Sequence, residues 1–388
     1  MHRRQENRQN LSGFFYDYPL TDHQGRFIIS NMAKTSGPKQ NKILVRLLCL
    51  TVIVVALIAL LDMLPVALPA PGPNPFLRQK NEAPLIIPHG GAKILYPENT
   101  LYSFSEIFRR GWKTFEIDLC LTRDGVLVSH HDLSIDRTSD GGDRLVRDLD
   151  AMELRAFNFT SKFIGIDGKP FNAAQVPAEL LVPATLRELF ALYPDALYIL
   201  ELKDRYSAGT EAHALRAVDT LLRDIGDFAM EERVMLSTFD QTVMKHLRER
   251  LKAPEYTRIL TNAVEMDALL VGILSSLRLD SFWKPSFSGL MIPHNIALSD
   301  SDARRVIAFP SFIRRNMFRQ NDETGVWHTA FAQNRIVRTA RRHRIALCFW
   351  TVNEEEDLRY LIDLGVDGII TDRPDIMEAI LAERIPTR

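Results

Sequence analysis

The fold is decided by one stretch near the end of the chain, where residues 346–371 read ALCFWTVNEEEDLRYLIDLGVDGIIT. Its first part, 346–352, is almost entirely apolar, which is typical of a buried strand. Residues 354–364 carry apolar side chains three to four positions apart, and this spacing predicts an amphipathic helix. A second apolar run follows at Gly368–Thr371 after a short loop. Strand, helix and strand joined by short loops predict two parallel strands with a crossover helix.

The same alternation extends back along the chain to residue 85. Strand-like runs alternate with helical runs such as 241–251, and eight candidate strands can be counted. The candidate strands are 85–88, 114–119, 197–202, 234–238, 257–260, 289–293, 346–352 and 368–371. This order predicts an α/β domain of the (β/α)8 class, a TIM barrel, and the roughly 300 residues after Leu85 suffice for its core.

Carboxylates and imidazoles occur where candidate strands end. Glu116 and Asp118 lie two positions apart in a strand-like stretch, so both side chains project to one face. Two carboxylates on one face favour a hard cation such as Mg²⁺ or Ca²⁺, and the chain lacks the Cys-x-x-Cys and His-Glu-x-x-His spacings of zinc sites. A solvated strand face or an ion-paired couple explains this pair alone equally well.

Histidines flank the same region. His89 follows the first candidate strand and precedes a glycine pair, and His130 and His131 follow the strand-like run 126–129. Two histidines can divide the roles of base and acid in the hydrolysis of an unactivated ester, although a single histidine is more often structural. The tandem leaves open which of His130 and His131 points inward. In a TIM barrel the strand ends share the catalytic face, which does not by itself define the reaction.

Several short motifs follow one another from residue 89 onwards. They are His-Gly-Gly at 89–91, Pro-Glu-Asn-Thr at 97–100, Glu-x-Asp at 116–118, Thr-Arg-Asp-Gly at 122–125, His-Asp at 131–132 and Asp-Arg-Thr at 136–138. Further along come PATLREL at 183–189, YILELK at 198–203, WTVN at 350–353 and LGVDGIITDRP at 364–374. In order and spacing these motifs resemble the glycerophosphodiester phosphodiesterase family, and the resemblance covers roughly residues 85–381.

The resemblance implies an enzyme with a barrel fold that hydrolyses small glycerophosphodiesters to glycerol 3-phosphate and an alcohol. It also implies roles for seven side chains. The implied metal ligands for Mg²⁺ or Ca²⁺ are Glu116, Asp118 and Glu201, the implied catalytic histidines are His89 and His131, and the implied substrate-binding residues are Lys203, facing the phosphate, and Trp350.

One departure from the family pattern concerns phosphate binding. Many members have His-Arg-Gly where this chain has His89-Gly90-Gly91, so an arginine that would bind a phosphate oxygen is missing. Another cation is then needed. Lys93 and Arg137 are candidates, although a solvated side chain is the simpler expectation for each.

The N-terminal part predicts a membrane anchor. Residues 47–61 are almost purely apolar, and residues 1–42 hold seven Lys and Arg against three Asp and Glu. We therefore expect a cytoplasmic tail over 1–42, a transmembrane signal anchor over 43–67, a proline-rich linker over 68–83 and a periplasmic or extracellular catalytic domain over 84–388. The apolar core of 15 residues also suits a cleaved signal peptide, and residues 1–31 could precede the true start at Met32.

Composition narrows the remaining alternatives. The formal net charge of −1 gives no reason to expect a nucleic-acid partner. Three cysteines do not make a disulfide framework, and Cys120 and Cys348 are expected to be buried. Two rival functions stay open: a phospholipase D-like lyase acting on intact lipids, and an inert membrane-tethered binding protein, which the missing arginine motivates.

Overall fold

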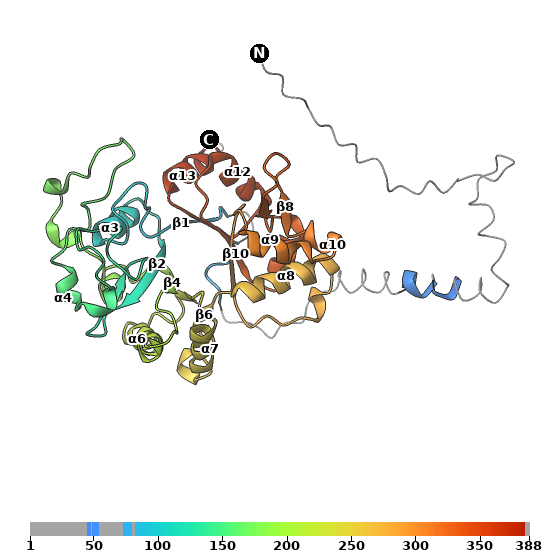
Figure 1. Cartoon of the computed structure of the whole chain (residues 1–388), viewed down its shortest axis with the longest axis horizontal. Helices are drawn as coiled ribbons and strands as arrows, with labels where there is room; N and C mark the ends of the chain where they lie inside the picture. Colours follow the sequence, from blue (N-terminus) through green and yellow to red (C-terminus); the bar gives the residue numbers. More distant parts are fainter. Residues whose placement is uncertain (1–44, 48, 54–72, 80–81, 385–388) are drawn as a thin grey trace, which may run out of the picture. The chain divides into compact units, whose positions relative to one another are not determined.

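The computed structural model describes residues 45–47, 49–53, 73–79 and 82–384, and the chain divides into two units, 1–61 and 62–388 (Figure 1). In the first unit the described residues are helical and exposed. Among the described residues, no helix is long and apolar enough to cross a membrane. The predicted tail over 1–42 and most of the predicted anchor over 43–67 lie outside the described residues, so the anchor and the domain boundaries stay predictions.

Parallel strands close into a barrel in the second unit. Within residues 82–384 the eight barrel strands are β1 (Leu85–Pro88), β2 (Thr114–Leu121), β4 (Leu197–Leu202), β5 (Val234–Ser237), β6 (Leu260–Thr261), β7 (Gly289–Pro293), β10 (Ala346–Trp350) and β11 (Gly368–Thr371). One sheet has the order β1-β11-β10-β7 and the other includes β2-β4-β5-β6. Parallel bridges from His89 to Glu116 and from Asn262 to Gly289 join the two sheets, which confirms the predicted TIM barrel.

Helices follow most strands and cover the outside of the barrel. They are α3 (Leu101–Arg109), α4 (Ala151–Leu154), α5 (Leu186–Leu192), α6 (Glu211–Asp227), α7 (Gln241–Arg250), α8 (Glu265–Leu277), α9 (Asp300–Ile307), α10 (Ser311–Arg314), α11 (Asn334–Arg342), α12 (Glu355–Leu364) and α13 (Pro374–Glu383). Side chains cap several of them: the Thr185 hydroxyl accepts from the Glu188 N–H at the start of α5, and Asp240 accepts from two N–H groups of α7. Gly365 ends α12 with a φ of 78°, which glycine adopts without strain.

One predicted strand was misplaced. The run 257–260 was expected to be extended, but the strand β6 covers only Leu260–Thr261 and a 3₁₀ turn at Pro254–Tyr256 precedes it. Pro254 has a fixed φ and no N–H, so it fits the first turn of a helix and delays the extended backbone.

Two segments interrupt the barrel alternation. After β2 the chain turns back as β3 (Leu127–Ser129), antiparallel to β2, and the long connection to α5 contains α4. Between β7 and α11 lie α9, α10 and a hairpin of β8 (Phe318–Gln320) and β9 (Trp327–Thr329). Ile313, Met317 and Phe318 are buried there, so this aromatic and cationic segment is partly packed against the barrel.

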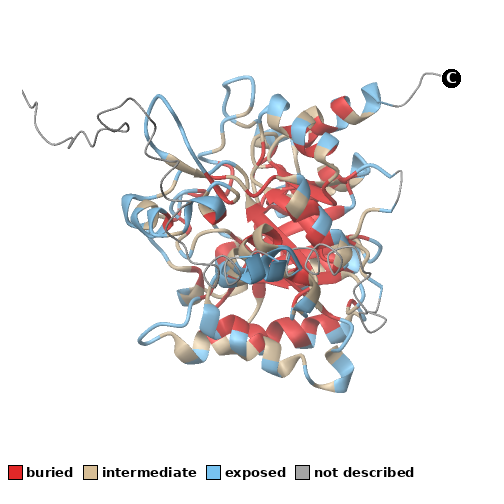
Figure 2. Ribbon diagram, turned by 90° about the vertical axis from the view of Figure 1, so that its right-hand side faces the viewer, coloured by how far each residue is buried: buried red, intermediate tan, exposed pale blue. Residues whose placement is uncertain are grey.

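The barrel interior is closed from below by a segment that precedes the first strand. Residues 73–79, called the floor segment here, place the fully buried Phe76 among interior side chains that include Ile87, Met235 and Cys348. The Asn74 side chain donates to the Ser288 carbonyl at 3.1 Å, and the Arg78 N–H donates to Asp367 at 2.9 Å. These partners precede β7 and β11, so the floor segment lies at the N-terminal end of the strands. Figure 2 shows the buried residues gathered on the strands and on the inward faces of the helices.

Candidate active site

A cavity of about 210 Å³ opens at the C-terminal ends of the strands. Its position is that of the catalytic face in TIM barrels. Six predicted site residues line it: His89, Glu116, His131, Glu201, Lys203 and Trp350. The seventh, Asp118, is fully buried beside them, so the structure brings together every residue that the sequence predicted for the site.

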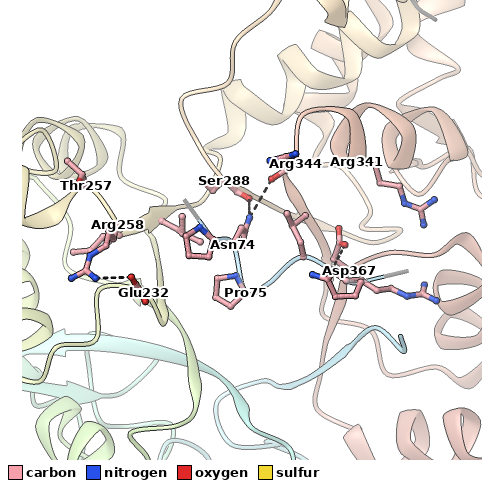
Figure 3. Close-up of a pocket in the computed structure, with 15 residues that line it drawn as sticks. Asn74, Pro75, Glu232, Thr257, Arg258, Ser288, Arg341, Arg344 and Asp367 are labelled. Carbon is pink, nitrogen blue, oxygen red and sulfur yellow. Dashed lines mark hydrogen bonds and ion pairs between the residues drawn. The ribbon is translucent and has the colours of Figure 1, made fainter. Parts of the chain in front are cut away.

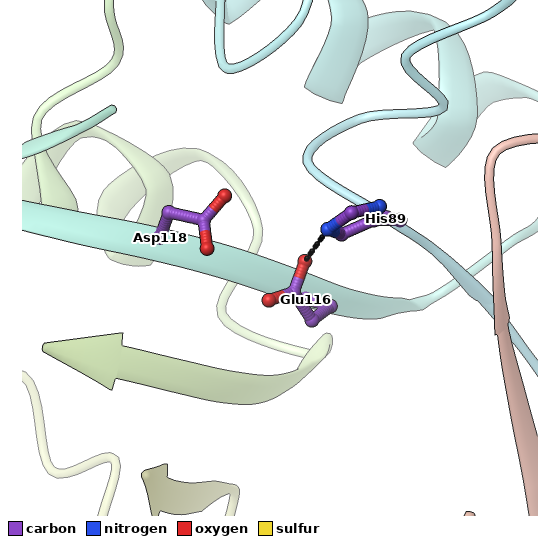
Figure 4. A group of neighbouring side chains, drawn as sticks. All are labelled: His89, Glu116 and Asp118. Atoms are coloured by element: carbon purple, nitrogen blue, oxygen red, sulfur yellow. Dashed lines mark ion pairs between the residues drawn. The ribbon is translucent and has the colours of Figure 1, made fainter. Parts of the chain in front are cut away.

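The deepest group of this cavity could hold a metal ion. One donor atom from each of His89, Glu116 and Asp118 lies within 4.8 Å of the other two (Figure 4). The Gly90 N–H donates to Glu116 Oε2 at 3.1 Å and orients that carboxylate. Asp118 Oδ1 is buried and makes no hydrogen bond, although the Lys203 ammonium lies 2.9 Å away. Carboxylate oxygens with unused acceptor capacity suit a hard divalent cation.

Glu201 stands apart from this group of donors. Its Oε1 accepts from Lys203 Nζ at 2.5 Å, and the same ammonium reaches Asp118. The predicted metal set of Glu116, Asp118 and Glu201 therefore differs from the geometric one, in which His89 takes the third place. The sequence could not show this because the direction of a side chain that leaves a strand end depends on the following loop.

Burial and neighbouring charges set opposite proton affinities on the two carboxylates of β2. Burial and the charge of Asp118 raise the pKa of Glu116 to about 7. Burial also disfavours charge on Asp118, but the ammonium groups of Lys93 and Lys203 outweigh it and hold the pKa of Asp118 well below its usual range. Burial raises the pKa of Glu201. The site thus carries one firmly ionised carboxylate and one that retains a proton easily.

Two histidines are each held by a carboxylate at Nδ1. His89 Nδ1 lies 2.9 Å from Asp372 Oδ1, and His131 Nδ1 lies 2.8 Å from Asp132 Oδ1. Such a contact fixes the tautomer and directs the other ring nitrogen elsewhere. His130, by contrast, is buried away from the cavity, with its ring nitrogens bonded to the Asp132 carbonyl and to the Thr138 hydroxyl. His131 lines the cavity and His130 does not, so His131 is the cavity-facing member of the tandem.

One functional residue, Asp372, was not predicted from the sequence, and Lys93 was predicted only as a candidate for phosphate binding. Asp372, which follows β11, orients His89 and in turn accepts from Asn353 at 2.9 Å. Both residues belong to quoted motifs, and a carboxylate directly after a strand end was the signal that could have found Asp372. Lys93, for which a solvated role was the simpler expectation, instead places Nζ 2.9 Å from His89 Nε2. Arg137 bonds to Asp132 at 2.6 Å and to Glu98, so it supports the partner of His131.

A larger cavity, of about 1130 Å³, lies around the floor segment at the opposite end of the strands (Figure 3). Arginines line much of it, and Arg258 pairs with Glu232 at 2.8 Å. No histidine lines it among the described residues. The chemistry of the molecule is therefore assigned to the smaller cavity.

Comparisons with known proteins identify the family of the chain. The model of the glycerophosphoryl diester phosphodiesterase family matches residues 89–376. A glycerophosphodiester phosphodiesterase of Caldanaerobacter subterraneus is 27% identical over 297 residues, covering 76% of this chain and 96% of the relative. A crystal structure of a putative glycerophosphoryl diester phosphodiesterase from Silicibacter pomeroyi has a TM-score of 0.55 at 22% identity, covering 79% of this chain and 95% of that one.

An Oleispira antarctica phosphodiesterase in complex with the product sn-glycerol-3-phosphate has a TM-score of 0.51 at 19% identity, covering 77% of this chain and 97% of that one. The structural likenesses support the fold, and the family match covers the whole of the candidate site. The chain is therefore an enzyme of the glycerophosphoryl diester phosphodiesterase family.

Proposed function

We propose that this enzyme uses a divalent cation to hydrolyse glycerophosphodiesters to glycerol 3-phosphate and an alcohol. The observation that carries the proposal is the cluster of His89, Glu116 and Asp118 with His131 at one cavity, where a carboxylate holds each of the two histidines. Glu116 and Asp118 would hold Mg²⁺ or Ca²⁺, with Glu201 close by, and His89 beside them transfers protons. The product named in the Oleispira antarctica complex supports glycerol 3-phosphate as the phosphate-bearing half.

The cation would neutralise phosphate charge and lower the pKa of a bound hydroxyl or water. The chain's own residues supply proton transfer: one histidine accepts the proton of the attacking oxygen and the other protonates the leaving alkoxide. Asp372 and Asp132 stabilise the imidazolium that forms on His89 and His131 respectively. Lys203 binds the phosphate, and Trp350, edge-on to Phe239 with ring centroids 5.9 Å apart, forms an apolar wall for the substrate.

The test is release of glycerol 3-phosphate from a panel of glycerophosphodiesters by the full-length chain. The protein is assayed with chelator and then with Mg²⁺ or Ca²⁺ restored. We expect release that depends on the metal and is lost in Glu116→Gln, while Lys169→Met, an exposed lysine next to Asp167, retains it. Release that is insensitive to chelator would contradict the metal role. Turnover of intact lipids alone would favour the lyase, and no turnover of any diester would favour the inert binding protein.

We also propose that residues 43–67 anchor the enzyme with its catalytic domain outside the cytoplasm. The support is the excess of Lys and Arg over Asp and Glu before the apolar run. Protease added to cells whose outer membrane, where present, has been removed should cleave the catalytic domain. Protection of that domain until the cytoplasmic membrane is lysed would contradict the orientation.

A further inference from the structure

Lys93 occupies the centre of the acidic cluster. It lies in the turn that follows β1, where the Ala92 N–H donates to the His89 carbonyl and brings the chain back over the cavity. Its ammonium is 2.9 Å from His89 Nε2, 3.3 Å from Asp118 Oδ2 and 3.6 Å from Glu98 Oε2. The side chain is only 16% exposed.

Gly90 makes this position available. The φ of Gly90 is 51°, and a Cβ built there would lie 2.3 Å from Lys93 Cε. A side chain at position 90 and Lys93 in its present place therefore exclude each other. The glycine that replaces the family's arginine is complementary to a lysine that reaches the same cavity from three residues downstream.

Lys93 is placed to reach a phosphate. It lines a neighbouring hollow of about 360 Å³ together with Glu98 and Arg137, while its ammonium contacts His89, which lines the catalytic cavity. On the other side of Asp118 the Lys203 ammonium is 2.9 Å from Oδ1. The two ammonium groups of Lys93 and Lys203 thus flank the carboxylates. A phosphate oxygen of the substrate could attract both groups away from these carboxylates. An ammonium ion binds phosphate as a point charge, without the geometry that a guanidinium demands.

We propose that Lys93 is a phosphate-binding residue of this enzyme and takes the place of the missing arginine. Its ammonium donates a hydrogen bond to a non-bridging oxygen of the substrate's phosphate, opposite Lys203. The inference rests on the proposed function. It excludes a purely structural role, in which Lys93 would only neutralise Asp118 and would not contact the substrate.

The experiment measures binding of sn-glycerol 3-phosphate to the full-length protein by calorimetry, alongside KM and kcat, in wild type and Lys93→Met. We expect the substitution to weaken binding and to raise KM by about tenfold or more, the loss for one charge-assisted hydrogen bond. Lys93→Arg should recover part of the affinity, and Lys169→Met should change nothing. Mg²⁺ binding without phosphate, measured in parallel, should not weaken in Lys93→Met because a competing cation is removed.

Gly90→Ala provides a second route that keeps the lysine. Its methyl group should displace Lys93 and weaken binding of glycerol 3-phosphate as Lys93→Met does. In the double variant the two effects should not add, because both remove the same contact. Melting curves identify a variant that fails to fold, in which case the other variant decides.

Two results overturn the inference in distinguishable ways. If both variants bind glycerol 3-phosphate as tightly as the wild type, Lys93 is only a counter-ion and the proposed function stands. If the wild type itself neither binds glycerol 3-phosphate nor hydrolyses a glycerophosphodiester, the proposed function fails and the role of Lys93 fails with it.

Discussion

Glu116→Gln should make the metal-free enzyme more stable at alkaline pH while abolishing its activity. The folded protein raises the pKa of Glu116 from an ordinary value near 4.5 to about 7. Between these two pH values the folded protein keeps a proton that the unfolded chain has released, so stability falls as pH rises. Glutamine has nearly the same shape, can still accept from the Gly90 N–H, and carries no charge.

The size of the effect follows from the pKa. One pKa unit corresponds to about 1.4 kcal/mol, so a rise from near 4.5 to about 7 costs the folded state about 3 kcal/mol at pH 8. In chelator, the free energy of unfolding of Glu116→Gln should exceed that of the wild type by up to this amount at pH 8 and by almost nothing below pH 4. Added Mg²⁺ or Ca²⁺ should make the wild type more stable than Glu116→Gln, because a cation that binds only the folded wild type stabilises it.

The assay is urea unfolding of the intact chain followed by tryptophan fluorescence. Trp112, Trp283, Trp327 and Trp350 are the chain's four tryptophans and all belong to the barrel unit, so the signal reports the barrel. Asp118→Asn is the matched control with the opposite expected sign. Lys93 and Lys203 favour the charged form of Asp118, so removing that charge should lower the free energy of unfolding by about 3 kcal/mol. A Glu116→Gln protein that is less stable than wild type at pH 8 in chelator would refute the reasoning.

Four further substitutions separate structural from chemical roles. His130→Ala should lower the melting temperature but leave kcat per folded molecule nearly unchanged. His131→Ala should keep the melting temperature and lower kcat by at least about 100-fold. Equal effects of the two substitutions would contradict the assignment of His131 as the cavity-facing histidine. Asp372→Asn should lower the pKa of His89, because the Asp372 carboxylate favours the imidazolium form. The acidic limb of the pH–rate profile should therefore move to lower pH. An unmoved limb would contradict the role of Asp372 in orienting His89. Phe76→Ala should cost about 3–5 kcal/mol in urea unfolding with kcat retained, and a cost below 1 kcal/mol would show that the floor segment is not part of the core.

Hydrophobic pattern predicted the barrel well because strands and helices impose fixed periods on the residues they bury. It located strands such as Leu85–Pro88 and Gly289–Pro293 at their observed bounds. It failed at 257–260, where Pro254 favours a turn and the remaining strand has two residues, too few for any period to be recognised.

The candidate site was predicted in its members but not in its contacts. His89, Glu116 and Glu201 could be expected at one face because they follow parallel strands. The approach of Lys93 to His89 depends on a turn with a glycine at positive φ, and its long side chain has many rotamers. The hydrophobic periodicity of the sequence carries no information about the shape of this turn or about the rotamer of Lys93. The contact of Asp372 with His89 joins residues 283 positions apart, which one sequence cannot reveal.

The floor segment has a consequence for the time course of biosynthesis. Arg78 finds its partner Asp367 only 289 residues later in the chain, and Asn74 finds the Ser288 carbonyl 214 residues later. At ordinary rates of translation the ribosome takes roughly 15–60 s to make the intervening 289 residues. Two members of the cluster around Phe76, Cys348 and Ile370, lie on β10 and β11, so its burial is incomplete until these strands have been made. The floor of the barrel can therefore be completed only after the last strands have been made.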